Sequence, residues 1–137
     1  MLKPTNTNYL FKFSIVTAVY NVAPYLSEAI DSILSQDIGF LESVELILVN
    51  DGSTDASGAI CDEYQHKYPE NIVVIHKPNG GVASARNAGI AVARGRYVNF
   101  MDSDDKLTPD TLSSVYDFFI EHDKEVDLVS VPIFYFE

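Results

Sequence analysis

Short apolar runs alternate with amphipathic helical patterns along almost the whole chain, and this alternation restricts the fold more than any other feature. Five runs are expected to form strands, at residues 13–19, 44–50, 71–76, 96–102 and 128–136. Helical patterns lie between them, at residues 24–34, 56–68, 82–94 and 108–122. Regular alternation of strand and helix predicts an α/β fold with a Rossmann-like, mostly parallel sheet and helices on both faces.

Local signals place the ends of several of these helices. Pro24 opens the first helix, whose apolar residues recur at helical spacing. Gly95 is expected to end the third helix, because glycine is common just after a helix C-terminus. Thr108 is expected to cap the fourth helix, with Pro109 at its first position.

The size and composition of the chain suit one folded domain. It has 137 residues, of which 47% are hydrophobic, and this is enough for a packed core. Acidic residues outnumber basic ones 20 to 9, for a formal net charge of −11. That balance disfavours binding to nucleic acid or to an anionic membrane surface. We expect an N-terminal extension over residues 1–12 and one ligand-binding domain over residues 13–137.

Several features favour a cytoplasmic location. The single cysteine, Cys61, rules out an intrachain disulfide and fits a reducing compartment. The N-terminus lacks the apolar segment of a signal peptide, and no apolar run approaches the length of a membrane span.

Polar residues and glycines cluster at the points where the expected strands end. The four groups read "TAVYN", "NDGS", "KPNGG" and "DSDD", one after each of the first four strands. An Asp-Gly pair alone is a common turn. However, the carboxyl ends of parallel strands share one edge of the sheet, which is where ligands bind in open α/β folds. The four groups together therefore predict a binding site at that edge.

The third group combines backbone donors with a cation. Gly80 and Gly81 precede a helix, so their N–H groups are expected to be open to an anion. Arg86 lies in the second turn of that helix, where a cation opposes the helix dipole. Two interpretations stay open. Arg86 either pairs with Asp51 or Asp102 for structural reasons, or reaches a phosphate or sugar hydroxyl of a ligand.

The fourth group places Asp102, Asp104 and Asp105 within four positions. Three carboxylates at a strand end suit a hard divalent cation, Mg²⁺ or Mn²⁺, which prefers oxygen ligands. An EF-hand loop would need Gly in place of Leu107, and an aspartyl-phosphatase motif would need Thr in place of Lys106. For Asp105 alone, a role in a capping turn is the open alternative.

These motifs together resemble the N-terminal half of family 2 glycosyltransferases, which share the GT-A fold. The resemblance rests on four stretches in the family's order, covering residues 13–112. They are "SIVTAVYN" with "LSEAIDSILSQ", "VELILVNDGSTDAS", "NGGVASARNAGIAVARGRYVNFMDSDD" and "LTPDTL". The resemblance implies that the protein transfers a sugar from a nucleotide diphosphate donor to an acceptor hydroxyl, with inversion at the anomeric carbon.

The resemblance also implies roles for particular residues in the nucleotide site. Ala18, Tyr20 and Asn21 correspond to the loop that lines the base pocket. Asp51 corresponds to the carboxylate that accepts a hydrogen bond from uracil, which implies a UDP-sugar, with dTDP and GDP donors left open. Ser53 belongs to the same donor-binding set. Asn50 departs from the family's more usual Asp and removes a charge there.

The sugar and diphosphate side of the site follows in the same way. Gly81 and Arg86 correspond to positions near the sugar and diphosphate. Asp102, Ser103 and Asp104 match the family's DXD motif, with Asp104 as the direct ligand of Mn²⁺ or Mg²⁺ and Asp102 near the ribose and the metal. The resemblance makes residues 13–137 the nucleotide-sugar-binding (donor) domain, truncated before the acceptor half.

The catalytic base of the family lies in the C-terminal half, so it is expected beyond residue 137 and is unknown here. The acceptor implied is a saccharide or a lipid-linked chain, met at the inner face of the membrane in the full-length protein. Two other functions are the alternatives. A nucleotidyltransferase would need a Gly-rich, Arg-containing loop after the first strand, where this chain has "AVYNVAPYL". A non-catalytic nucleotide- or metal-binding module stays open.

Overall fold

The computed structural model describes residues 9–122. Within this part of the chain, four parallel strands form one sheet in the order β3-β2-β1-β4. The strands are β1 (Phe11–Val19), β2 (Val44–Asp51), β3 (Ile72–Lys77) and β4 (Gly95–Phe100). The helices are α1 (Ala23–Leu34), α2 (Phe40–Ser43), α3 (Ser57–Lys67), α4 (Val82–Val92) and α5 (Thr111–Glu121). The predicted α/β fold with a parallel sheet is thus confirmed, and the fifth strand, expected at 128–136, lies outside the described residues.

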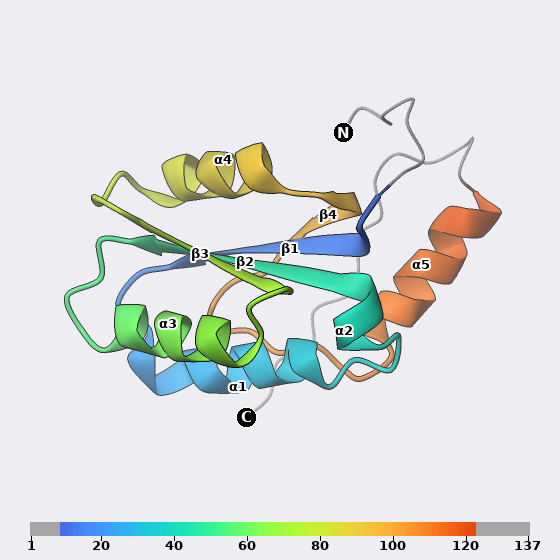
Figure 1. Cartoon of the computed structure of the whole chain (residues 1–137), viewed down its shortest axis with the longest axis horizontal. Helices are drawn as coiled ribbons and strands as arrows, with labels where there is room; N and C mark the ends of the chain where they lie inside the picture. Colours follow the sequence, from blue (N-terminus) through green and yellow to red (C-terminus); the bar gives the residue numbers. More distant parts are fainter. Residues whose placement is uncertain (1–8, 123–137) are drawn as a thin grey trace.

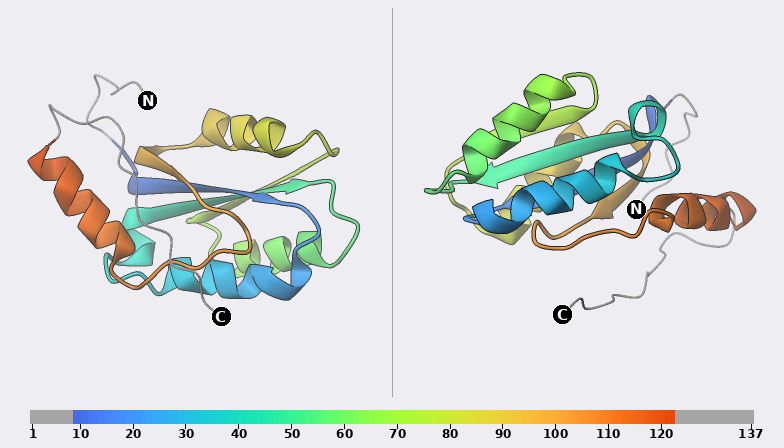
Figure 2. Two further views of the ribbon diagram at one scale, coloured as in Figure 1. Left: turned by 180° about the vertical axis from the view of Figure 1, so that it is seen from behind. Right: turned by 90° about the horizontal axis from the view of Figure 1, so that it is seen from below.

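Helices cover both faces of the sheet. Helix α4 lies on one face, and α1 and α3 lie side by side on the other (Figures 1 and 2). Strand β2 is buried along its whole length because both its faces are covered. Gly89 lets α4 pack directly on β1, since a Cβ at this position would overlap Cγ1 of Val16.

The segment between β4 and α5 runs along α1 to the opposite end of the sheet (Figure 2). Gln36, just after α1, donates to the carbonyl of Thr108 at 2.7 Å and accepts from the N–H of Leu112 at 3.0 Å. Helix α5 then packs through Phe119, whose ring stacks on Tyr97 of β4 at a centroid distance of 4.2 Å.

The start of α5 differs from the prediction. The helix begins at Thr111, so Thr108 is not its cap and Pro109 is not its first residue. The carbonyl of Pro109 instead accepts a hydrogen bond from the N–H of Asp37 at 2.8 Å. The carbonyl of Thr108 is shared between Gln36 and the N–H of Thr111. Bonds to the end of α1 thus hold these residues in a turn before the helix.

Gly95 is also placed differently from the prediction. Helix α4 ends at Val92, and Gly95 is the first residue of β4. A Cβ at Gly95 would lie 2.5 Å from the backbone nitrogen of Ser14, so the need for glycine comes from close approach to β1. Strand β4 then ends at Phe100, two residues before the predicted end, and Asp102 lies in the following loop.

Strand β1 begins at Phe11, two residues earlier than expected. In the described part of the chain, none of the helices combines the length and apolar character needed to cross a membrane.

Candidate functional site

The loops that follow the four strands meet at one edge of the sheet, because all four strands are parallel. Hydrogen bonds join the loop after β1 to the loop after β2, and the loop after β2 to the loop after β3. The loop after β4 contacts α4. The structure therefore brings the four polar groups of the sequence together.

The first two loops are held together by Asn21 and Ser53. Asn21 has a left-handed backbone with φ of 50°, a conformation that asparagine tolerates better than most residues. Its Oδ1 accepts from the N–H of Thr54 at 2.8 Å, and its own N–H donates to Oγ of Ser53 at 3.1 Å. Both side chains bind the neighbouring loop. Tyr20 next to them is 51% exposed, and Ala18 is half-buried near the α4 face.

Asp51 is the buried carboxylate of the site. Its Oδ1 accepts from Nζ of Lys77 at 2.7 Å and from the N–H of Gly80 at 2.9 Å, and its Oδ2 accepts from the N–H of Gly81 at 2.9 Å. The hydrogen bond from Lys77, together with the two backbone bonds, lowers the pKa of Asp51 although burial opposes this. Asp51 is thus held as an anion. A carboxylate has about four acceptor sites, so three donors leave room for one more.

This arrangement corrects one expectation. The N–H groups of Gly80 and Gly81 were expected to be open to an external anion, but both donate to Asp51. The anion that faces them is a side chain of the protein, delivered by the end of the neighbouring strand.

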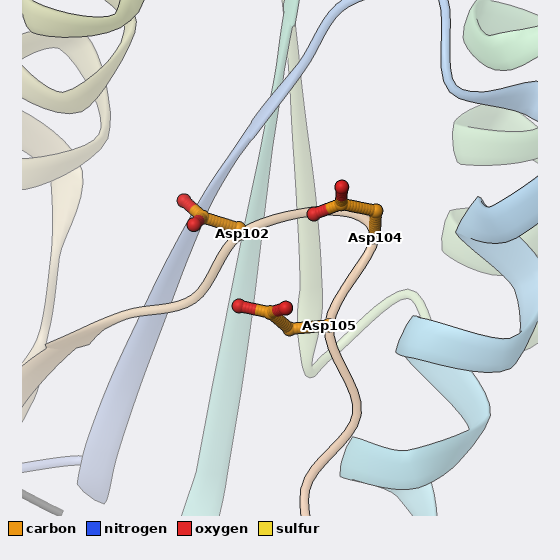
Figure 3. A group of neighbouring side chains, drawn as sticks. All are labelled: Asp102, Asp104 and Asp105. Carbon is orange, nitrogen blue, oxygen red and sulfur yellow. The ribbon is translucent and has the colours of Figure 1, made fainter. Parts of the chain in front are cut away.

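The acidic turn after β4 consists of Asp102, Asp104 and Asp105, and Figure 3 shows all three on this one loop. The three residues are exposed, and one carboxylate oxygen from each lies within 4.8 Å of the others. Burial, followed by the charges of Asp102 and Asp104, raises the pKa of Asp105. Ser103 between them is buried.

The acidic turn fits a hard divalent cation in its chemistry. Carboxylate oxygens are the ligands that Mg²⁺ and Mn²⁺ prefer. A cation would relieve the repulsion among the three carboxylates, which contributes to the raised pKa of Asp105. The carboxylate of Asp105 lies with the other two in this turn.

Arg86 faces the acidic turn. Its guanidinium Nη2 lies 3.5 Å from Oδ1 of Asp102, and its Cζ lies 5.4 Å from the ring centroid of Phe100. Of the two structural partners considered for Arg86, the contact is with Asp102. Both side chains are well exposed, at 42% and 66%, so the ion pair is weak and the guanidinium stays accessible.

Lys77 and Asn79 belong to the third polar group, but no individual role was predicted for either of them. Lys77 neutralises Asp51, and Nδ2 of Asn79 donates to the carbonyl of Asp51 at 3.0 Å. Lys77 is the last residue of β3 and pairs in register with Asp51 at the end of β2. The available signal was its place directly after the predicted third strand, 71–76.

The fold places this chain among glycosyltransferases of the GT-A type. It superposes with a TM-score of 0.75 on residues 1–349 of S. aureus TarS, crystallised in complex with UDP-GlcNAc, at 35% identity. The match covers 82% of this chain and 32% of that one. The sequence model described as "Glycosyl transferase family 2" matches residues 14–137. The chain belongs to glycosyl transferase family 2.

Two relatives from Bacillus subtilis (strain 168) are named as teichoic acid biosynthesis proteins. The minor teichoic acid biosynthesis protein GgaB is 52% identical over 130 residues, which are 95% of this chain and 14% of GgaB. The minor teichoic acid biosynthesis protein GgaA is 42% identical over 125 residues, which are 90% of this chain and 28% of GgaA. The chain thus spans less than a third of the length of either relative.

Proposed function

We propose that this chain is the donor-binding part of an inverting glycosyltransferase that moves a sugar from a UDP-sugar to an acceptor hydroxyl. The observation that carries this proposal is the pairing, at one edge of a family 2 sheet, of an ionised buried carboxylate with a turn of three exposed carboxylates. One suits a nucleobase and the other a metal–diphosphate.

The nucleobase half of the proposal rests on Asp51. An ionised carboxylate can only accept hydrogen bonds, so its remaining acceptor site matches a ring N–H such as N3–H of uracil. Ala18, Tyr20 and Asn21 complete the base pocket in this proposal, with Ser53 holding the loop. The crystal structures of TarS with UDP and with UDP-GlcNAc support uracil as the base. Thymine and guanine also present a ring N–H, so dTDP and GDP are the donors to compare.

The diphosphate half rests on the acidic turn. Asp104 would ligate Mn²⁺ or Mg²⁺ directly, and Asp102 would share the metal and the ribose. When bound, the metal would stabilise the negative charge that develops on the leaving diphosphate. Arg86 would add a second positive charge beside Asp102, and Gly81 and Ser103 would shape the backbone around the sugar and diphosphate.

The acceptor is proposed as a saccharide or lipid-linked precursor of a bacterial cell-envelope polymer, as the names of the teichoic acid relatives suggest. We place the reaction in the cytoplasm, at the inner face of the membrane. The catalytic base that deprotonates the acceptor is expected beyond residue 137.

The proposal is tested by calorimetric titration of UDP into the chain with Mn²⁺ and again with EDTA. Asp104→Ala is the test variant, and Asp117→Ala, an exposed acid of α5 far from the site, is the matched control. We expect binding that needs the metal and is lost in Asp104→Ala alone. Equal binding of UDP with and without metal would show that the acidic turn does not bind the diphosphate through a metal ion. Tighter binding of dTDP or GDP than of UDP would overturn the donor assignment.

An assay of sugar transfer by the full-length protein tests the non-catalytic alternative. If that protein binds UDP with metal but transfers no sugar, the fold serves as a non-catalytic binding module.

A further inference from the structure

A chain of hydrogen bonds joins helix α3 to the loop that carries Asp51. Nε2 of His76 lies 2.8 Å from Oδ1 of Asp62 on α3, and Nδ1 of His76 lies 3.0 Å from Nδ2 of Asn50. Oδ1 of Asn50 accepts from the N–H of Ser53 at 3.1 Å. Asn50 and His76 are paired directly across β2 and β3, so the sheet register itself brings them together.

The polarity of this chain is fixed from its backbone end. The N–H of Ser53 can only donate, so the atom of Asn50 that faces it must be the oxygen. The amide nitrogen of Asn50 then faces His76 and donates, which makes Nδ1 of His76 an acceptor. The ring proton must therefore be on Nε2, where it meets the carboxylate of Asp62. Every bond is satisfied with His76 neutral and protonated on Nε2.

Close packing removes the alternative positions of the amide. A Cβ at Gly58 of α3 would lie 2.8 Å from Nδ2 of Asn50 and 3.7 Å from Cε1 of His76. The backbone of α3 thus lies against the pair. Asn50 is 8% exposed, so water cannot readily replace a lost partner. If Asn50 turned its amide over, Nδ2 would face the N–H of Ser53, donor against donor.

Ser53 connects the orientation of Asn50 to the loop after β1. Its Oγ accepts from the N–H of Asn21 and lies 3.4 Å from the carbonyl of Val19. The orientation of Asn50 thereby determines how the loop after β2, with Asp51, meets the loop after β1. We propose that His76, as the neutral Nε2–H tautomer, is a positioning residue for nucleotide binding, acting through Asn50 on Ser53. This proposal rests on the proposed function.

The groups that face His76 determine which ring nitrogen carries the proton. From α3 the charged group that faces it is Asp62, a carboxylate that accepts from Nε2. From β2 the facing group is the uncharged Asn50, whose donor opposes a proton on Nδ1. The carboxylate of Asp51 is turned to Lys77, Gly80 and Gly81 instead. An aspartate at position 50 would remove this opposition, because it could only accept.

Two conservative variants divide the roles of the imidazole. In His76→Asn the side-chain oxygen can occupy the place of Nδ1 and keep an acceptor for Asn50, while the contact with Asp62 is lost. In His76→Gln the longer amide reaches Asp62 but offers Asn50 no acceptor at the Nδ1 position. His66→Gln, on the exposed side of α3, is the matched control.

The first readout is the affinity for UDP with Mn²⁺. We expect His76→Asn and His66→Gln to bind within about twofold of the unmodified chain, and His76→Gln to bind about 2- to 10-fold more weakly, as for the loss of one hydrogen bond. Equal weakening in both His76 variants, or none in either, would overturn the proposal.

The second readout does not depend on UDP, so it separates this proposal from the proposed function. Nitrogen NMR should show His76 protonated on Nε2, and protonated on Nδ1 in Asn50→Asp. The amide of Ser53 should exchange with solvent slowly in the unmodified chain and in His76→Asn, and faster in His76→Gln. A proton on Nδ1 in the unmodified chain, or an unchanged Ser53 amide in His76→Gln, would contradict the positioning role even if UDP does not bind.

Discussion

At the residue scale, Asp51 joins folding to ligand binding. Asp51 is 4% exposed, and its carboxylate accepts hydrogen bonds from three donors, two in the loop after β3 and one on Lys77. The same group is the proposed acceptor for the nucleobase. A carboxylate that is already held as an anion loses no proton when the nucleobase binds. The free energy needed to fix the Asp51 side chain is spent during folding and not on binding.

Substitution of Asp51 should therefore lower stability in a pH-dependent way. In Asp51→Asn the charge is lost and the amide presents a donor to the Gly80 and Gly81 side, so the free energy of unfolding should fall by about 3 kcal/mol at pH 7. The pKa of Asp51 is lowered from 3.8 in the fold. Its stabilisation is present above the unfolded pKa and is lost as the pH falls through the folded pKa.

Denaturant unfolding at a series of pH values measures this effect. The difference in stability between the unmodified chain and Asp51→Asn should be constant from pH 7 to about pH 5 and should shrink below about pH 4. The exposed Asp117→Asn is the control and should show little change. A difference that stays constant down to about pH 2 would mean that the charge of Asp51 does not stabilise the fold.

The single cysteine should be chemically inert in the folded chain. Cys61 of α3 is fully buried in the core, and burial raises the pKa of its thiol to about 12. The thiolate is the reactive form, so a disulfide reagent at pH 8 should modify Cys61 only in denaturant. Rapid modification without denaturant would show that α3 opens locally.

At the element scale, the contact between α4 and β1 sets the position of the helix that carries Arg86. Gly89 occupies the closest approach, against Val16 of the central strand. Ala85 of α4 packs with Val16, Ile47 and Val49 in a buried apolar cluster between this helix and the sheet. A side chain at position 89 would push α4 outward and with it the guanidinium.

Gly89→Ala should accordingly destabilise the chain although alanine favours helix formation. The added methyl would overlap Cγ1 of Val16, and overpacking of this kind costs about 1–3 kcal/mol. Thermal unfolding measures the loss. Ala91→Gly measures the effect of helix propensity alone at an exposed position of α4. The double variant Gly89→Ala with Val16→Ala removes the steric clash, and it should recover part of the stability if the clash is the cause.

At the scale of the whole molecule, the chain carries a net charge of −11, yet its proposed ligand is an anion. The positive groups of the site, Lys77 and Arg86, are each paired with an aspartate. A nucleotide diphosphate would therefore meet a site with no surplus positive charge of its own, and a divalent cation on the acidic turn would supply it.

The prediction at this scale concerns sugar transfer and its dependence on a divalent metal. Residues 1–137 alone should bind UDP with Mn²⁺ but transfer no sugar, because the catalytic base is expected further along the chain. The full-length protein should transfer sugar and should stop when EDTA removes the metal. Release of UDP from a UDP-sugar in the presence of acceptor measures both. Efficient transfer by residues 1–137 alone would place the base within this chain.

Local sequence signals were sufficient for the main elements. Apolar runs, with or without a period of two, predicted strands β1 to β4 to within a few residues. The helical periods between them did the same for α1, α3 and α4, because these periods report which face is buried. The helix α2 was missed because its four residues are too short to show a period. Since the strands are parallel, the placing of the four polar groups at one edge followed from their order alone.

The tertiary structure decided which groups pair with which. Gly80 and Gly81 donate to Asp51 because β2 and β3 are adjacent and in register, and a helix signal in the sequence cannot report this. The carbonyl of Pro109 accepts from Asp37, which lies 72 positions away in the chain, and this moved the start of α5. The sequence by itself determined what is buried and the order of the elements, since these depend on local periodicity. The structure determined the partners of each polar group, since these depend on close approach between residues distant in the chain.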